Sequence, residues 1–218
     1  MRANITRRLA GAGIAGLLAG GFGLVAAAPA HAATHTCHGQ TATIVGTDGA
    51  DRIVGTAGRD VIVGLGGNDE IDGRGGNDLI CGRAGADEIE GGAGNDRIYG
   101  GIGNDEIDGG SGNDRVYGSS GHDEIDGDSG NDWVSAGTGH DVVDGDRGND
   151  RVYGGSGNDH LEGESGGDKL SGQDGHDLVE GGSAPDRVRG GAGRDIVAQG
   201  SVSERVEERW EDRYGYDD

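Results

Sequence analysis

The 218-residue chain has very few of the large apolar residues that usually build a protein core. Aromatic residues make up 4% of it, with a single Phe, and the hydrophobic fraction is 32%. A chain this poor in apolar groups does not bury enough surface to overcome the conformational entropy lost on folding. Its composition is typical of a disordered chain unless interactions other than a hydrophobic core stabilise the fold. The composition therefore argues against an ordinary globular domain.

Basic residues are also scarce. Lys and Arg number 18 against 40 Asp and Glu, which gives a formal net charge of −22 at pH 7. A chain this acidic repels nucleic acid and anionic membranes and attracts cations. We therefore expect no nucleic-acid partner and no membrane insertion.

The first 32 residues have the features of a secretory signal peptide. Arg2, Arg7 and Arg8 form a charged start, residues 9–28 are apolar, and Ala30-His31-Ala32 is a small-residue cleavage site. The alternative, a membrane anchor, is disfavoured by the many glycines and by the cleavage site. We predict a secreted, extracellular protein, exported by the general secretory or the twin-arginine route.

The chain contains only two cysteines, Cys37 and Cys81. Two cysteines in a secreted chain imply one disulfide, with a free-thiol or zinc role as the alternative. The disulfide would close a loop of about 45 residues, worth about 4 kcal/mol in the chain-entropy model.

Glycine and aspartate, in contrast, are abundant and strictly periodic. Residues 91–117 read GGAGNDRIY GGIGNDEID GGSGNDRVY, one nine-residue unit written three times. The aspartates continue in this register through 17 repeats, and Ile, Leu or Val stands two residues after each of them, from Ile53 to Val197. These aspartates are Asp51, Asp60, Asp69, Asp78, Asp87, Asp96, Asp105, Asp114, Asp123, Asp132, Asp141, Asp150, Asp159, Asp168, Asp177, Asp186 and Asp195.

Over residues 46–198 the chain resembles the RTX, or haemolysin-type calcium-binding, family, whose nonapeptide this is. The resemblance implies an all-β fold, a parallel β-roll that forms a right-handed solenoid of 18-residue coils. Residues 33–45 are interpreted as an N-terminal capping segment and residues 199–218 as a C-terminal cap and tail. In that tail Val202, Val206 and Trp210 have the spacing of a short amphipathic capping helix.

Within each repeat we expect a six-residue turn and a three-residue strand whose middle, aliphatic residue points inward. The glycines at the first and fourth positions of the unit are each kept in 16 of 17 repeats, with Ala136 and Ala184 as the exceptions. These two positions are expected to need positive φ or a close backbone approach.

Stacked coils bring aspartates 18 residues apart close together, in two columns that start at Asp51 and Asp60. Ca²⁺ suits such sites because it takes six to eight oxygen ligands in a flexible cage, whereas Mg²⁺ demands a tighter octahedron. The columns contain 8 and 7 gaps, so 15 ions is the ceiling. Because one aliphatic side chain per repeat, worth roughly 1.5–3 kcal/mol, cannot order nine residues, we predict that calcium binding drives folding. The alternative is that the aspartates only form turns.

The residues that flank the inward aliphatic differ between the two predicted sheets. One face carries Arg97, Tyr99, Arg115, Tyr117, Trp133, Arg151, Tyr153, Lys169, Arg187 and Arg189; the other carries Glu70, Asp72, Glu88, Glu90, Glu106, Asp108, Glu124, Asp126, Asp144, Glu162 and Glu180. The basic-aromatic face is a candidate for binding an extracellular polysaccharide or acidic polymer, as an adhesin or matrix module would. The alternative, which we favour, is that both faces are solvated ladders.

We predict no enzymatic activity and a monomer. His122, His140 and His176 each precede a repeat aspartate, but the asparagine that they replace contributes mainly backbone, and no matched nucleophile accompanies them. Near the N-terminus, Val61, Val63 and Leu79 form an apolar outer patch that we expect the Cys37 segment to cover.

Overall fold

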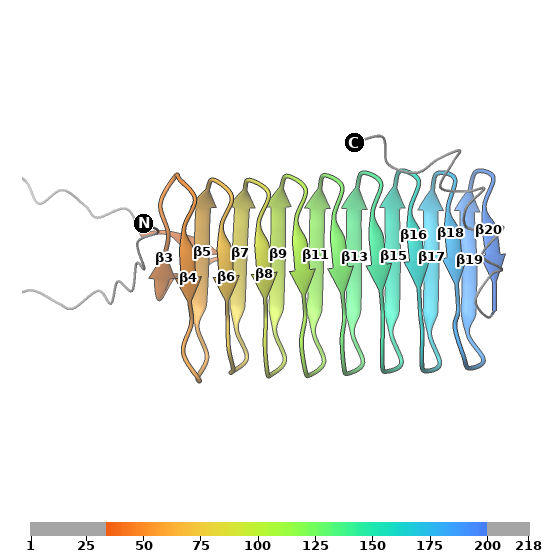
Figure 1. Ribbon diagram of the computed structural model, residues 1–218, viewed down its shortest axis with the longest axis horizontal. Helices are drawn as coiled ribbons and strands as arrows, with labels where there is room; N and C mark the ends of the chain where they lie inside the picture. The colour runs from red at the N-terminus through yellow and green to blue at the C-terminus, as the bar shows by residue number, and fades with distance from the viewer. Residues whose placement is uncertain (1–33, 200–218) are drawn as a thin grey trace, which may run out of the picture.

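The computed structural model describes residues 34–199, and the regular secondary structure of this part is entirely β. It is a parallel β-solenoid of about nine coils stacked along one straight axis (Figure 1). The predicted signal peptide and the predicted C-terminal capping helix lie outside the described residues. Among residues 34–199, no helix is long and apolar enough to cross a membrane.

Two nine-stranded sheets of opposite direction form the walls of the solenoid (Figure 1). The first contains β3 (Ile44–Val45), β5 (Val61–Gly66), β7 (Leu79–Ala84), β9 (Arg97–Ile102), β11 (Arg115–Ser120), β13 (Trp133–Thr138), β15 (Arg151–Ser156), β17 (Lys169–Asp174) and β19 (Arg187–Ala192). The second contains β4 (Arg52–Val54), β6 (Glu70–Asp72), β8 (Glu88–Glu90), β10 (Glu106–Asp108), β12 (Glu124–Asp126), β14 (Val142–Asp144), β16 (His160–Glu162), β18 (Leu178–Glu180) and β20 (Ile196–Ala198).

Every pairing within these two sheets is parallel and joins residues 18 apart. Ile62 is opposite Ile80 in one sheet, and Ile71 is opposite Ile89 in the other. Two nonapeptides therefore make one coil, and the expected β-roll architecture is confirmed.

The core is the single file of aliphatic side chains that stand two residues after the aspartates. From Ile53 to Val179 these side chains are at most 2% exposed. At the C-terminal end Val188 is only partly buried and Val197 is 43% exposed. The strict period thus places one buried aliphatic side chain in each half-coil.

The first sheet differs from the prediction in the length of its strands. Its strands from β5 onward have six residues rather than three, because the first turn residues also pair with the neighbouring coils, as Leu65 does with Arg83. The backbone of both residues has positive φ, +86° at Leu65 and +85° at Arg83. From Leu65 to Gly191 the second position of the repeat therefore also adopts the left-handed conformation, including where it carries a residue other than glycine.

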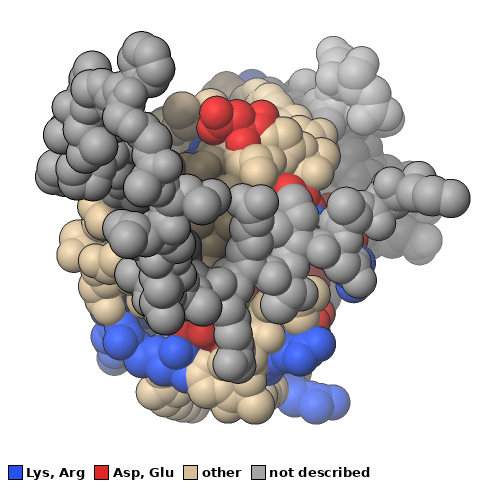
Figure 2. All heavy atoms as spheres, turned by 90° about the vertical axis from the view of Figure 1, so that its left-hand side faces the viewer, with Lys and Arg blue, Asp and Glu red and all other residues tan. Residues whose placement is uncertain are grey.

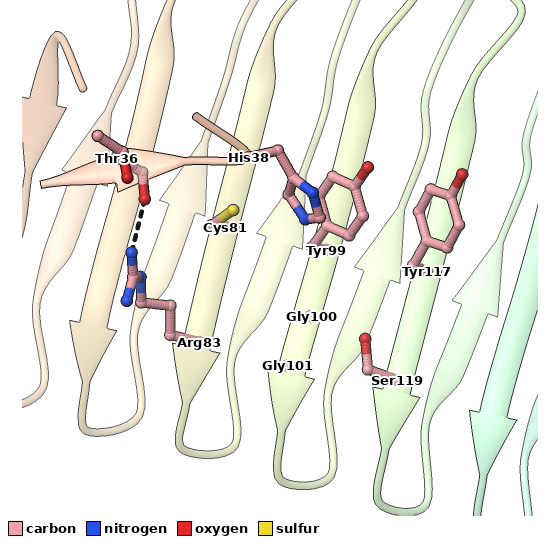
Figure 3. A pocket seen from close by; sticks show the side chains of 9 residues that line it. All are labelled: Thr36, His38, Cys81, Arg83, Tyr99, Gly100, Gly101, Tyr117 and Ser119. Atoms are coloured by element: carbon pink, nitrogen blue, oxygen red, sulfur yellow. Dashed lines mark hydrogen bonds between the residues drawn. The ribbon is translucent and has the colours of Figure 1, made fainter. Parts of the chain in front are cut away.

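An antiparallel hairpin, β1 (Thr36–Cys37) and β2 (Gln40–Thr41), lies on the first sheet at its N-terminal end. As predicted, the Cys37–Cys81 disulfide holds it there, over a buried cluster that contains Val61, Val63 and Leu79. Figure 3 shows the Arg83 guanidinium donating to the Thr36 carbonyl oxygen at 2.6 Å. The hairpin thus supplies a second, smaller apolar core to the first coils.

Breaking this disulfide is expected to destabilise the N-terminal coils. In the chain-entropy model a loop of this size stabilises the folded state by about 4 kcal/mol. A Cys37→Ser, Cys81→Ser variant should therefore show a clearly lower urea midpoint than the wild type at saturating calcium. The wild type measured with and without reductant is the control; equal midpoints for all samples would contradict the expectation.

The fourth-position glycines approach the preceding coil closely. Gly112 has φ +145°, and a Cβ there would collide with the carbonyl oxygen of Gly94. The first-position Gly109 has ordinary φ, and a Cβ there would lie 3.1 Å from the carbonyl oxygen of Gly127. Both predicted reasons for glycine are thus seen, at different positions of the unit.

Alanine substitution at these two glycines of one turn should have unequal effects. Gly112→Ala combines left-handed strain with a backbone collision, so we expect a loss of at least about 3 kcal/mol of folding free energy. Gly109→Ala is expected to cost about 1 kcal/mol, because only small shifts are needed and Ala136 already occupies an equivalent position. Urea unfolding at saturating calcium measures the loss of folding free energy of both variants. Equal losses for Gly109→Ala and Gly112→Ala would refute the different reasons given for glycine at the two positions.

Candidate metal centre

The two aspartate columns form as the sequence predicts. Each aspartate ends a turn immediately before a strand, so stacking places it beside the aspartate 18 residues away. The backbone N–H of Asp105 donates to Asp123 Oδ1 at 3.0 Å, and that of Asp114 donates to Asp132 Oδ1 at 2.7 Å. All 15 neighbouring pairs, from Asp51–Asp69 to Asp177–Asp195, make this bond.

The second carboxylate oxygen of these aspartates is buried and accepts no hydrogen bond. Fourteen aspartates share this property: Asp69, Asp78, Asp87, Asp96, Asp105, Asp114, Asp123, Asp132, Asp141, Asp150, Asp159, Asp168, Asp177 and Asp186. A buried polar atom without a partner is costly, and a charged one is far more so unless a counter-charge accompanies it. Two rows of unsatisfied Oδ2 atoms therefore run along the solenoid.

Burial has a direct electrostatic consequence for these carboxyls. It raises the pKa of Asp105 to about 7; the N–H donated by Asp87 lowers this pKa, and the charges of Asp123 and Asp87 raise it. Burial likewise raises the pKa of Asp96, Asp132, Asp141 and Asp159 to about 7, and that of Asp69, Asp114, Asp123, Asp150 and Asp177 to about 6. Without a cation, the ionised folded roll is electrostatically disfavoured at neutral pH.

The unsatisfied oxygens face the first glycine of their own repeat. A Cβ added to Gly64 would lie 2.5 Å from Asp69 Oδ2 and 2.7 Å from the carbonyl oxygen of Gly82, one coil further on. Carboxylate and carbonyl oxygens therefore line the same space between coils. Buried oxygen donors of this kind fit a hard cation such as Ca²⁺, which would supply the missing counter-charge, and offer no nitrogen or sulfur ligand.

The first two aspartates of the columns have a different environment. Asp51 Oδ2 accepts from the backbone N–H and the hydroxyl of Thr47, and Asp60 Oδ2 accepts from the same groups of Thr56. Threonine stands here in place of the second glycine of the unit. A threonine hydroxyl thus satisfies the oxygen that lacks a partner in the following repeats.

Comparison with known protein families agrees with this geometry. The model of the RTX calcium-binding nonapeptide repeat, which spans four copies, matches residues 45–80, 82–116, 108–143, 117–152, 135–170, 153–187 and 171–198. The chain belongs to the RTX calcium-binding repeat family. A search of curated proteins finds no match.

The residue before the aspartate builds a second ladder in this RTX roll. Asn95 Oδ1 accepts from the backbone N–H of Asn113, one coil further on, at 2.7 Å. Histidine takes the same part: His122 Nδ1 accepts from the N–H of His140 at 2.7 Å, and His176 Nδ1 from that of Arg194 at 2.9 Å. The expectation that this position contributes mainly backbone was therefore wrong, since its side chains accept hydrogen bonds from the next coil.

Ser165 is the one serine in a formal G-x-S-x-G sequence, residues 163–167. That motif supplies a nucleophile only when the serine stands on a sharp turn between a strand and a helix. Ser165 instead lies in an RTX turn between β16 and β17, and its hydroxyl donates to the Asp146 carbonyl oxygen at 3.2 Å. This environment is that of a turn residue.

One further acidic group was not singled out by the sequence analysis. Carboxylate oxygens of Asp144, Glu162 and Glu164 lie within 4.8 Å of one another on the second sheet and the turn that follows it. Burial, followed by the charges of Asp146, Glu162 and Glu164, raises the pKa of Asp144 to about 6, although the N–H donated by Asp146 lowers it. An acidic residue at the second position of the repeat, next to an acidic strand end, is the signal for such a group.

Proposed function

We propose that this RTX protein binds calcium ions between adjacent coils through its aspartate columns, and that it folds when it binds them. The observation that carries the proposal is the set of 14 buried Oδ2 atoms that accept no hydrogen bond. They fall in two columns of seven, with six gaps in each, so the structure favours about twelve ions rather than the ceiling of 15. Asp51, Asp60 and Asp195, at the ends of the columns, are the weakest candidates.

Calcium supplies positive charge where the fold buries negative charge. Its binding to the folded state alone stabilises that state by mass action. Extracellular calcium modules bind at about 10⁻⁴–10⁻³ M, so the roll would be unfolded where calcium is scarce and folded outside the cell. We therefore place its function outside the cell, in agreement with the acidic composition and the predicted signal peptide.

The test is a calcium titration of the purified protein followed by far-UV circular dichroism. We expect a cooperative transition from coil to β structure near about 1 mM Ca²⁺. Magnesium at the same concentration is the control and should not produce the transition, because Mg²⁺ demands near-ideal octahedral geometry. Full β structure in chelator would contradict folding on binding, and an equal response to magnesium would contradict calcium selectivity.

A further inference from the structure

The two outer faces of the solenoid carry opposite charges. On the first sheet, exposed cations stand at the start of successive strands, among them Arg97, Arg115 and Arg151. On the second sheet, exposed carboxylates stand at the equivalent position, among them Glu88, Glu106 and Glu124. Figure 2, the end-on view, keeps the strands vertical, so its groups of Lys and Arg in the lower part and of Asp and Glu at the top differ in position along the strand direction. The surface charges are therefore sorted rather than mixed.

These six side chains form no ion pair with one another or with any other residue in the range 34–199. In residues 34–199, the only ion pairs are Arg52–Glu70, Arg74–Asp72 and His160–Glu162, none of which involves these six residues. The strand register places Arg97 directly opposite Arg115, and Glu106 directly opposite both Glu88 and Glu124. Like charges directly opposite one another destabilise a sheet. Each face therefore gains from contact with a surface of the opposite charge.

Aromatic side chains run beside the arginines on the first sheet. The rings of Tyr99 and Tyr117 are parallel, with centroids 4.6 Å apart, and His38 of the hairpin stacks on Tyr99 at 3.7 Å (Figure 3). The Trp133 ring, 4.9 Å from that of Tyr117 and 5.7 Å from that of Tyr153, fills the gap in this row. Tyr, Trp and Arg are the residues enriched at protein interfaces, so this face has the composition of a binding surface.

The complement of this face is present on the same molecule, with the same repeat. Both ladders advance by one residue per coil, and neighbouring strands of a sheet lie about 4.8 Å apart. The hairpin covers the first strands of the first sheet, so its free ladder runs over the six strands from β9 to β19, which is about 29 Å. Strands of three to six residues span about 10–20 Å, so the contact covers roughly 300–600 Å² per partner, the size of a weak, reversible interface. Because the ladders are periodic, one face fits the other in several registers.

In place of the monomer expected from the sequence, we propose that folded copies of this chain associate face to face, with the arginine–aromatic face of one copy on the carboxylate face of the next. Such a contact uses two different surfaces, so each added copy presents a free face of each kind. The association is therefore open and builds stacks rather than a closed dimer. It goes beyond calcium binding, since it requires the folded roll and not the ion itself.

Sedimentation velocity on the wild type, under conditions where circular dichroism shows β structure, provides the test. We expect at least about a twofold rise in weight-average mass with protein concentration in about 0.1 M NaCl, where the Debye length is roughly 10 Å. The rise should disappear in about 1 M NaCl, where the Debye length is roughly 3 Å. A wild type that folds but stays monomeric at low salt would overturn the proposal. If that monomer bound a polyuronate, an acidic polysaccharide, the result would favour the acidic-polymer hypothesis instead.

Two charge-reversal variants make the test specific. One carries Arg97→Glu, Arg115→Glu and Arg151→Glu and has two acidic faces; the other carries Glu88→Lys, Glu106→Lys and Glu124→Lys and has two basic faces. Each variant alone should be monomeric, and an equimolar mixture should associate. Circular dichroism of each variant separates loss of folding from loss of association. Association of either variant alone, or a mixture of folded variants that stays monomeric, would overturn the proposal.

Discussion

Replacing Asp105, Asp123 and Asp141 by asparagine is expected to stabilise the calcium-free roll and to destabilise the calcium-loaded roll. The three residues are neighbours in one column, and each Oδ1 accepts a backbone N–H from the preceding coil. An asparagine oxygen keeps that bond. The substitution therefore removes the buried charge and leaves the turn in place.

The charge of these three aspartates has opposite effects on stability in the absence and in the presence of calcium. Without calcium, burial raises the pKa of all three carboxyls, so each ionised carboxylate destabilises the folded state at neutral pH, and asparagine removes this effect. With calcium, four gaps in the column lose a charged ligand, and calcium affinity depends on ligand charge. We expect the calcium midpoint of folding to rise by about tenfold or more.

Circular dichroism measures both effects. In chelator, it gives the osmolyte concentration needed to fold the protein. Without osmolyte or chelator, it gives the calcium concentration at the midpoint of folding. The matched control is Glu88→Gln, Glu106→Gln, Glu124→Gln, which removes the same charge from exposed positions. This control should shift both quantities little. If the asparagine variant were less stable than the wild type in both conditions, the aspartates would be turn-forming residues and not ligands.

Acid is expected to replace calcium in part. Burial raises the pKa of ten column aspartates to about 6 or 7, whereas an aspartate titrates near 3.9 in an unfolded chain. Between these values the folded state holds more protons than the unfolded state. The stability that these protons confer is therefore present in full below about pH 4 and is lost as the pH rises through 6–7.

In chelator, the β signal of the wild type should grow as the pH is lowered from about 7.5 to about 5. In calcium, the dependence reverses, because Ca²⁺ and protons compete for the same carboxylates, and the calcium midpoint should rise over this range. The Asp105→Asn, Asp123→Asn, Asp141→Asn variant should show weaker dependence in both series. A chelated wild type that loses β structure on acidification would contradict the environment described for the columns. Sedimentation at each pH distinguishes folding from precipitation.

The resemblance to the RTX family implied the architecture, and the period of nine then placed every inward position and every aspartate within it. The pairing of Cys37 with Cys81 was predictable because the chain has no other cysteines. The burial of Val61, Val63 and Leu79 was predictable because apolar residues interrupt an otherwise polar outer face. These features depend on position within the repeat and on little else.

Other features depend on contacts with the neighbouring coil, which the period does not specify. Leu65 has positive φ although its side chain disfavours this conformation, and Arg74, in the turn after a three-residue strand, has it as well, so the turn itself requires it. The hydroxyls of Thr47 and Thr56 satisfy aspartates four residues later, which makes the first repeats functionally different from the rest. The Trp133 ring occupies a gap that the small side chain of Ser135 leaves, which only the cross-strand register reveals.

The threonine-bonded first coils also give the roll a direction of assembly. In a solenoid each coil contacts only its neighbours, so folding propagates from whichever end forms first. The N-terminal end combines a disulfide, a second apolar cluster and two aspartates whose Oδ2 accepts a threonine hydroxyl, whereas the last inward residue, Val197, is 43% exposed. Under the proposed function, the N-terminal coils would form first, and each later coil would be added to them together with its calcium ions.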